Sequence, residues 1–240
     1  VYKLATQRFC VSPYMVEAYE HEWNVTADIL YPHRSPEAPT YDAPPQRLRD
    51  CSRIRVGYAG SFGIPGARML LSVAEELSDL PVEFVIYSPL DSVAARRNEV
   101  DHPNIEYRSL ISPQQVIPTL REEVDLLLAL MRFQDQREAI ARYSFPSKLT
   151  DYTATGLPIV LWGPEYWSAI RWADDHQNVA ECISTREPTD VARALRCFAA
   201  SPERRWTYGE RALTVGRDYF SHHQAVSTFQ EALSPESVVT

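Results

Sequence analysis

Apolar residues follow two repeating patterns from residue 53 onward. Runs such as 54–59 (IRVGYA) and 125–131 (DLLLALM) are apolar over nearly their whole length, which is typical of strands buried on both faces of a parallel sheet. Segments such as 67–80 carry apolar residues every three or four positions, which is the spacing of an amphipathic helix. The predicted strands are 54–59, 82–87, 105–107, 125–131, 158–162 and 179–183.

Helices are expected between these strands, and a helical tail with a break near Ser221 is expected after them. The predicted helices are 67–80, 91–97, 112–123, 147–155, 164–176, 189–200 and the tail at 203–233. This alternation predicts an α/β fold with a doubly wound, Rossmann-like parallel sheet. In such sheets ligands bind beyond the carboxyl ends of the strands, near helix N-termini.

The first 52 residues follow a different plan. Residues 8–11 and 27–31 are predicted as short strands, and the helix between them begins at Ser12-Pro13. Five prolines within 32–45 predict a stiff, extended linker, because proline fixes φ. The expected division of the chain is 1–52, a main domain at 53–220, and a C-terminal helix and tail at 221–240.

Composition and charge narrow the classes of function. The chain has a net charge of −8, and its basic residues are scattered. Nucleic-acid binding needs a basic surface to contact phosphates, so we do not expect it. No stretch approaches the roughly 18 consecutive apolar residues of a membrane helix, and no signal-peptide pattern is recognised. We expect a cytoplasmic location, with peripheral membrane contact left open.

The cysteines and histidines do not predict a metal site. The six histidines include the pair His222-His223 but no HExxH pattern. The cysteines show no CxxC pair, and we expect them to be buried reduced thiols. They are Cys10, Cys51, Cys182 and Cys197. Neither a metal nor a cofactor is expected.

A glycine-containing loop follows the first strand of the main domain. Gly60, Ser61, Phe62 and Gly63 join this strand to the next helix, and three of the chain's eight glycines fall between 60 and 66. Backbone amides in such a loop can approach an oxyanion closely. The loop fits neither G-x-G-x-x-G nor a Walker motif, and a plain turn is the alternative.

The segment 145–160 (FPSKLTDYTATGLPIV) predicts a stronger anion site. Ser147 is expected to cap a helix whose free amides attract an anion, with Lys148 adding positive charge. Asp151 lies one turn later on the same helix face, where a carboxylate can accept hydrogen bonds from a vicinal diol such as that of ribose. Gly156 is expected to end the helix. Alternatively, Lys148 and Asp151 form an exposed ion pair of little consequence.

The same segment resembles the signature of glycosyltransferase family 4 and its GT-B relatives, in the variant Phe-Pro-x-Lys-Leu-x-Glu-Tyr-x-Ala-x-Gly-x-Pro-Val-Val. Asp151 stands where this variant has its Glu. The family's carboxylate at this place holds the nucleotide ribose, and the helix start holds the diphosphate. The resemblance therefore implies these roles for Asp151 and for Ser147 and Lys148. The residues that match in place are Phe145, Pro146, Lys148, Leu149, Tyr152, Ala154, Gly156 and Pro158.

The resemblance extends over most of the chain. Residues 54–63 resemble the first donor-domain strand with its glycine loop, and 105–111 resemble the strand and loop that place the base. Residues 8–34 resemble the end of the N-terminal acceptor domain and the crossing into the donor domain. We therefore expect the chain to be the donor-binding half of a longer protein.

The sequence also departs from the family. Tyr143 stands where the family has its first Glu, which contacts the donor sugar. Arg68 is the sole basic residue near the glycine loop. The family's acceptor domain supplies a catalytic His, and none of the six histidines here can be assigned that role.

The residues expected at the site combine both lines of reasoning. Lys148 and Arg68 are predicted to stabilise the leaving diphosphate. Trp162, Trp167 and Trp172 are expected in the core, with a sugar-stacking surface as the alternative. The residues expected to bind the donor are Gly60, Ser61, Phe62, Gly63, Arg108, Arg132, Tyr143, Phe145, Pro146, Ser147, Lys148, Leu149 and Asp151.

The resemblance implies a retaining, metal-independent, hexosyl-type glycosyltransferase that uses a nucleotide-sugar donor, with UDP or GDP favoured as the nucleotide. The acceptor stays open among glycans, lipids and small molecules. Two alternatives remain: a GT-B sugar-nucleotide epimerase, and a non-catalytic GT-B-like domain kept for nucleotide binding or interaction.

Overall fold

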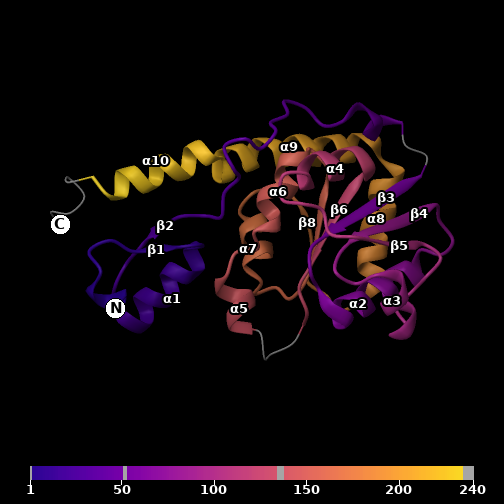
Figure 1. Ribbon diagram of the computed structural model, residues 1–240, viewed down its shortest axis with the longest axis horizontal. Coiled ribbons are helices and arrows are strands. Elements are labelled where there is room, and N and C mark those ends of the chain that lie inside the picture. The colour runs from indigo at the N-terminus through magenta and orange to yellow at the C-terminus, as the bar shows by residue number, and fades with distance from the viewer. Residues whose placement is uncertain (1, 51–52, 134–137, 235–240) are drawn as a thin grey trace.

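The computed structural model describes residues 2–50, 53–133 and 138–234 (Figure 1). Within them, six parallel strands form the central sheet, in the order β5-β4-β3-β6-β7-β8. Every strand predicted from 54 onward is present, so the doubly wound α/β sheet is confirmed. The strands are β3 (Ile54–Ala59), β4 (Val82–Tyr87), β5 (Ile105–Arg108), β6 (Leu126–Leu130), β7 (Ile159–Trp162) and β8 (Glu181–Ile183).

Helices cover both faces of the sheet. On β6, Leu127 and Ala129 belong to the core under α4, α6, α7 and α9, whereas Leu126 and Leu128 belong to the core under α2 and α8. Strand residues that alternate between two apolar cores explain why the strands read as continuous apolar runs. The helices are α2 (Gly63–Glu76), α3 (Ser92–Arg97), α4 (Val116–Glu123), α5 (Glu138–Tyr143), α6 (Lys148–Thr155), α7 (Ser168–Asp174), α8 (Pro188–Ala200) and α9 (Pro202–Phe220).

The sheet reverses its direction of growth between β3 and β6. The chain adds β4 and β5 on one side of β3 and then returns to place β6 on the other side. Ligands of such sheets bind outside the carboxyl ends of the strands at this switch point. Tyr152 of α6 lies there, because its hydroxyl accepts a hydrogen bond from the Ala59 amide at 2.9 Å.

The N-terminal part is a small unit beside the sheet domain. It contains the 3₁₀ turn η1 (Tyr2–Leu4), the helix α1 (Pro13–Trp23) and a two-stranded parallel pair, β1 (Phe9–Cys10) and β2 (Asp28–Ile29). Ser12 caps α1 as predicted, accepting a hydrogen bond from the Met15 amide. The linker then runs back along α9 to the 3₁₀ turn η2 (Gln46–Arg49) (Figure 1).

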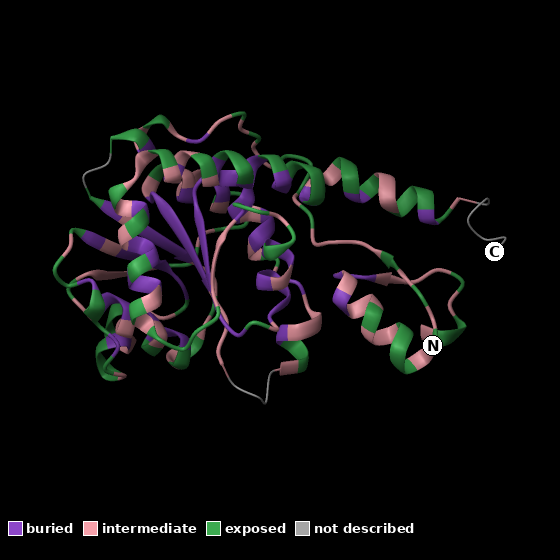
Figure 2. Ribbon diagram, turned by 180° about the vertical axis from the view of Figure 1, so that it is seen from behind, coloured by how far each residue is buried: buried purple, intermediate pink, exposed green. Residues whose placement is uncertain are grey.

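The C-terminal helix returns to this small unit. Ser221 is extended, with φ −71° and ψ 148°, and caps α10 (His222–Ala232) through the Gln224 amide, so the predicted break is confirmed. Phe229 of α10 stacks on Phe9, with ring centroids 5.4 Å apart. Figure 2 shows the contrast in burial between the sheet and this exposed extension.

Some predicted helix boundaries were wrong. The first helix of the domain begins at 63 rather than 67, because Pro65 falls in its first turn, where a missing amide is tolerated. Turns occupy the first residues of the segments predicted at 112 and 164, so α4 and α7 start later. The short helix α5 was not predicted.

The three tryptophans are buried, as expected for core residues. Cys10 is buried, but Cys197 is exposed, which corrects the expectation of burial for that thiol; Cys51 lies outside the described residues. Among the described residues, no group of three or more His, Cys, Asp or Glu side chains could hold a metal ion. The described helices include none with the length and apolar character needed to cross a membrane.

Candidate functional site

The glycine loop leaves the end of β3 with two residues at positive φ. Gly60 has φ 124° and Gly63 has φ 60°, values that side-chain-bearing residues rarely adopt. A Cβ atom at Gly60 would lie 3.5 Å from Nζ of Lys148. The loop therefore meets the start of α6.

The start of α6 is open to an anion, but Ser147 does not cap it. Ser147 is helical, with φ −56° and ψ −28°, and its side chain makes no capping hydrogen bond, which corrects the prediction. Among the described residues, the Ser147 and Lys148 amides donate no hydrogen bond. Free amides at a helix start carry partial positive charge. The site thus keeps the expected electrostatics without the expected cap.

The side chain of Lys148 extends from the start of α6 to Tyr58 and the glycine loop. Its Nζ donates a hydrogen bond to the Tyr58 hydroxyl at 2.6 Å and lies 3.9 Å from the centre of the Tyr58 ring. Although the residue is only half-buried, its ammonium is enclosed by protein, and this burial lowers the pKa of Lys148 to about 7. An anion bound nearby would favour the charged form.

Asp151 faces the same space with its carboxylate unpaired. Within the described part of the chain, no hydrogen bond or ion pair reaches this carboxylate. Burial raises the pKa of Asp151, and the charge of Arg34 on the opposite side of the helix partly offsets that rise. The carboxylate is therefore available to accept hydrogen bonds from a ligand.

Two adjoining pockets surround these groups. The larger, of about 520 Å³, lies by Phe62, Gly63, Arg132, Pro146 and Trp167, among others. The smaller, of about 310 Å³, lies by Gly60, Ser147 and Asp151. Ser61 and Lys148 line both.

Three predicted donor-binding residues lie in or toward the core instead. Phe145 is buried and packs against Tyr31 and Phe220, with ring centroids 5.0 Å and 5.6 Å away. Leu149 is fully buried. Tyr143 is partly buried, and its carbonyl accepts a hydrogen bond from Ser12 at 2.7 Å. None of the three lines either pocket. Motif matching cannot separate residues that build the helix from residues that face the ligand.

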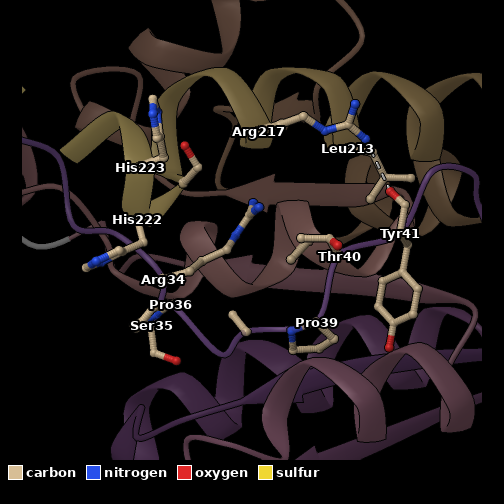
Figure 3. A pocket seen from close by; sticks show the side chains of 13 residues that line it. Arg34, Ser35, Pro36, Pro39, Thr40, Tyr41, Leu213, Arg217, His222 and His223 are labelled. Atoms are coloured by element: carbon tan, nitrogen blue, oxygen red, sulfur yellow. Dashed lines mark hydrogen bonds between the residues drawn. The ribbon is translucent and has the colours of Figure 1, made fainter. Parts of the chain in front are cut away.

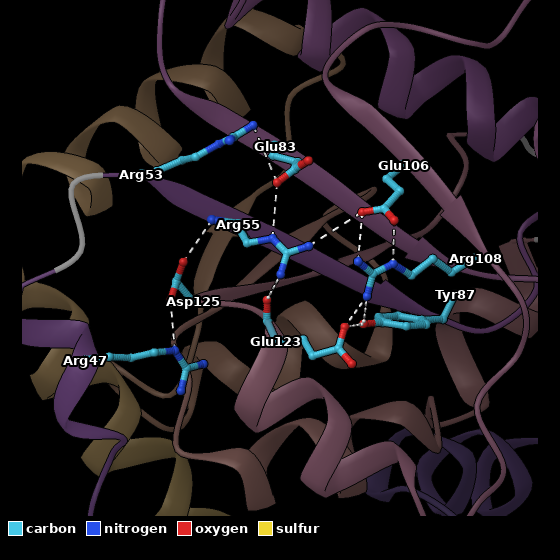
Figure 4. A network of polar contacts seen from close by, with 9 residues as sticks. All are labelled: Arg47, Arg53, Arg55, Glu83, Tyr87, Glu106, Arg108, Glu123 and Asp125. Carbon is cyan, nitrogen blue, oxygen red and sulfur yellow. Dashed lines mark hydrogen bonds and ion pairs between the residues drawn. The ribbon is translucent and has the colours of Figure 1, made fainter.

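Arg108 belongs to a network of ion pairs (Figure 4). It contacts Glu106 at 2.8 Å, Glu123, and the Tyr87 hydroxyl at 3.2 Å. Tyr87 lines the smaller pocket, whereas Arg108 does not. Arg108 is therefore placed to support the pocket wall through Tyr87.

Arg68 lies away from the other predicted residues. It is exposed on α2 and lines neither pocket. The structure does not bring it to Lys148, and its catalytic role stays a prediction.

Sequence reasoning missed several pocket residues. Tyr58 and Tyr87 were assigned to buried strands, and Tyr152 to the signature helix without a ligand role, yet all three line the pockets. Trp167 is a core residue as expected but also borders the larger pocket. A hydroxyl-bearing residue at or near the carboxyl end of an otherwise apolar strand, as in Tyr58 and Tyr87, was the available signal.

No protein-family model matches the sequence, and no curated protein matches it. Solved structures match it in shape. HepE of Anabaena, solved with UDP and glucose, aligns with a TM-score of 0.70 at 12% identity, over 98% of this chain and 64% of HepE. A glycosyltransferase from Rickettsia africae ESF-5 aligns with a TM-score of 0.68 at 11% identity, over 96% of this chain and 64% of that chain.

A third match is sucrose-phosphate synthase of Thermosynechococcus elongatus. It aligns with a TM-score of 0.67 at 10% identity, over 96% of this chain and 58% of that one. At these identities the likeness shows the fold, and the predicted GT-B, Rossmann-like fold is confirmed. This chain spans 64% of the length of the first two matches.

Proposed function

We propose that this chain is the donor-binding half of a glycosyltransferase that takes a sugar from a nucleoside diphosphate. One observation carries the proposal: the glycine loop, the open start of α6, Lys148 and Asp151 meet around two adjoining pockets at the switch point of the sheet. Clustered amides, a cation and an unpaired carboxylate suit a diphosphate beside a ribose.

Each part of the donor has a matching surface. The diphosphate would lie between the loop amides and the start of α6, next to Lys148. The ribose hydroxyls would donate to Asp151, and the base would lie in the smaller pocket near Leu110 and Ile111. The sugar would occupy the larger pocket, where Arg132 has no hydrogen-bond or ion-pair partner among the described residues.

In sugar transfer these residues would stabilise the negative charge that develops on the departing diphosphate. As the bond between the sugar C1 and the diphosphate oxygen breaks, an acceptor hydroxyl oxygen bonds to C1 and gives its proton to the departing phosphate oxygen or to water. The bond electrons pass to the departing diphosphate, whose added charge the protonated Lys148 and the helix amides stabilise. Retention of configuration, independence of metal and a hexose donor come from the family resemblance.

The likeness to HepE supports UDP as the nucleotide, since HepE was solved with UDP and glucose and with UDP-glucose. The acceptor would be bound with the help of parts that this chain does not cover, because it spans about two thirds of HepE. GDP is the alternative nucleotide.

The test is calorimetric titration of the chain with UDP, GDP, ADP and their glucose conjugates. We expect one nucleotide to bind, with at least tenfold weaker affinity in Asp151→Asn, since that variant loses a charged hydrogen-bond acceptor. Asp218→Asn is the matched control, because Asp218 is an exposed carboxylate on α9. Absence of binding by every nucleotide, or equal affinity in Asp151→Asn, would contradict the proposal.

A non-catalytic nucleotide-binding domain is the second candidate. The replacement of the family's first Glu by Tyr143, which lines neither pocket, favours it. Donor hydrolysis or transfer by the longer protein distinguishes the two, because a binding domain holds the donor without turning it over. The epimerase alternative has less support, since no histidine is among the described residues lining the two pockets.

A further inference from the structure

A third pocket lies beside Ala154 of α6, where the linker passes the junction of α9 and α10 (Figure 3). Its volume is about 270 Å³. The Arg34 amide donates to the Phe220 carbonyl at 3.0 Å, so the two segments that join the small N-terminal unit to the sheet domain lie side by side here. We call it the crossing pocket.

The crossing pocket is lined by basic rather than acidic side chains. Arg34, Arg217, His222 and His223 line it, and none of its described lining residues is acidic. This bias occurs in a chain whose net charge is −8. Arg217 forms an ion pair with Asp42 at 3.5 Å. The Asp42 side chain is fully exposed and does not line the pocket.

Several polar groups at this pocket have no protein partner. The His222 Nδ1 atom is buried and has no hydrogen-bond partner among the described residues. The amides of His222 and His223, at the start of α10, likewise donate no hydrogen bond within the described chain. Buried polar atoms are rarely left unpaired unless a water or ligand satisfies them.

The remaining wall is mostly apolar, with hydroxyl groups from Ser35, Thr40, Tyr41 and Ser221 at its border. Pro36, Pro39, Ala154 and Leu213 line it together with the stems of the arginines. Figure 3 shows the Arg34 guanidinium directed toward Thr40, Arg217 running along α9 toward Tyr41, and the rings of His222 and His223 directed away from Arg34. A mostly apolar cavity with a few convergent polar groups is the usual form of a small-molecule site.

We propose that the crossing pocket binds a small phosphate monoester with an apolar body. Arg217 and the open helix start recognise the phosphate, while Arg34, whose Nε and Nη2 already donate to Thr150 and Thr153, adds positive charge. The proline and leucine wall packs against the body. This site is separate from the donor pockets, and the inference does not depend on the proposed transferase function.

Phenyl phosphate is the probe, titrated calorimetrically into the chain with UDP present in excess to occupy the donor site. We expect binding at a single site, with at least tenfold weaker affinity in Arg217→Gln and in His223→Gln. Both side chains are exposed, so these variants should fold normally. Arg211→Gln is the matched control, since it removes an exposed arginine of the same helix that does not line the pocket.

Two further measurements separate this site from the donor site. Binding should persist in Lys148→Met, and inorganic phosphate should bind at least tenfold more weakly than phenyl phosphate. Absence of binding at millimolar probe, equal affinity in Arg217→Gln and His223→Gln, or loss of binding in Lys148→Met would each overturn the proposal. The titration of Lys148→Met with phenyl phosphate needs no UDP. Its result therefore tests the crossing pocket even if the wild-type chain binds no nucleotide.

Discussion

The ammonium of Lys148, held beside Tyr58 and Gly60, is expected to make the proposed nucleotide binding sensitive to pH. Burial lowers the pKa of Lys148 to about 7 in the free protein, whereas a bound diphosphate favours the protonated form and raises it. Binding then takes up a proton above pH 7, and affinity falls as the pH rises.

We expect the dissociation constant for UDP to rise by up to about tenfold per pH unit between pH 7 and the pKa of the complex. The phosphates of UDP are largely ionised over this range, so they contribute little. Calorimetric titration from pH 7 to 9 measures the effect, and Lys148→Met should bind weakly without this dependence. A constant affinity for wild type over the range would show that Lys148 does not contact the diphosphate.

Individual residues of the signature segment also mark the limit of sequence reasoning. Lys148 and Asp151 face the pockets as expected, while Phe145 and Leu149, from the same motif, are buried. The motif identifies a helix and the loop before it, but the rotation of that helix depends on how α9 packs behind it. The role of Arg34 was not predictable for the same reason, since its partners Thr150 and Thr153 lie 116 and 119 residues away.

At the scale of elements, the strands were predictable because burial on both faces requires an unbroken apolar run. Helix starts were less so. The turns before α4 and α7 contain Ser-Pro and Pro residues that can equally begin a helix, and α5 is a short helix without an extended apolar pattern. Boundaries of this kind are set by neighbouring elements rather than by local sequence.

Helices α6 and α9 pack closely where two glycines, Gly156 and Gly209, meet. A Cβ atom at Gly209 of α9 would lie 2.3 Å from the carbonyl oxygen of Gly156, which ends α6 in the left-handed conformation at φ 70°. The obstacle is backbone, so it cannot move aside as a flexible side chain would.

Gly209→Ala is therefore expected to destabilise the fold by about 1–3 kcal/mol through overpacking. This is the net change, after subtraction of the roughly 1 kcal/mol by which alanine favours a helix over glycine. Urea unfolding monitored by circular dichroism gives the free-energy difference, with Thr214→Ala at an exposed site of α9 as the control. A variant more stable than wild type would mean that α9 can shift away from α6.

Across the whole molecule, Arg205 joins the linker to the sheet domain. Its side chain is buried and donates to the carbonyls of Leu48 at 2.9 Å, Phe198 at 2.6 Å and Ala199 at 3.0 Å. The bonds reach from η2 to the end of α8, so one side chain fixes the last turn of the linker before the sheet begins.

Replacing Arg205 with Met should lower the free energy of unfolding by about 3 kcal/mol, because hydrogen bonds from a charged group are lost and buried carbonyls lose their partner. Chemical denaturation measures this change, and Arg211→Gln, an exposed arginine of the same helix, should change it by less than about 0.5 kcal/mol. Equal stability of Arg205→Met and wild type would show that water satisfies these carbonyls.

The contacts of Arg34 restrict which substitutions the protein can accept during evolution. Its guanidinium holds the Thr150 carbonyl and the Thr153 hydroxyl at 2.7 Å and 2.8 Å, and a Cβ atom at Gly216 would lie 2.5 Å from it. The same Cβ atom would lie 2.4 Å from the Thr153 hydroxyl oxygen, so Arg34, Thr153 and Gly216 restrict one another. In related sequences positions 34, 153 and 216 should therefore change together or not at all.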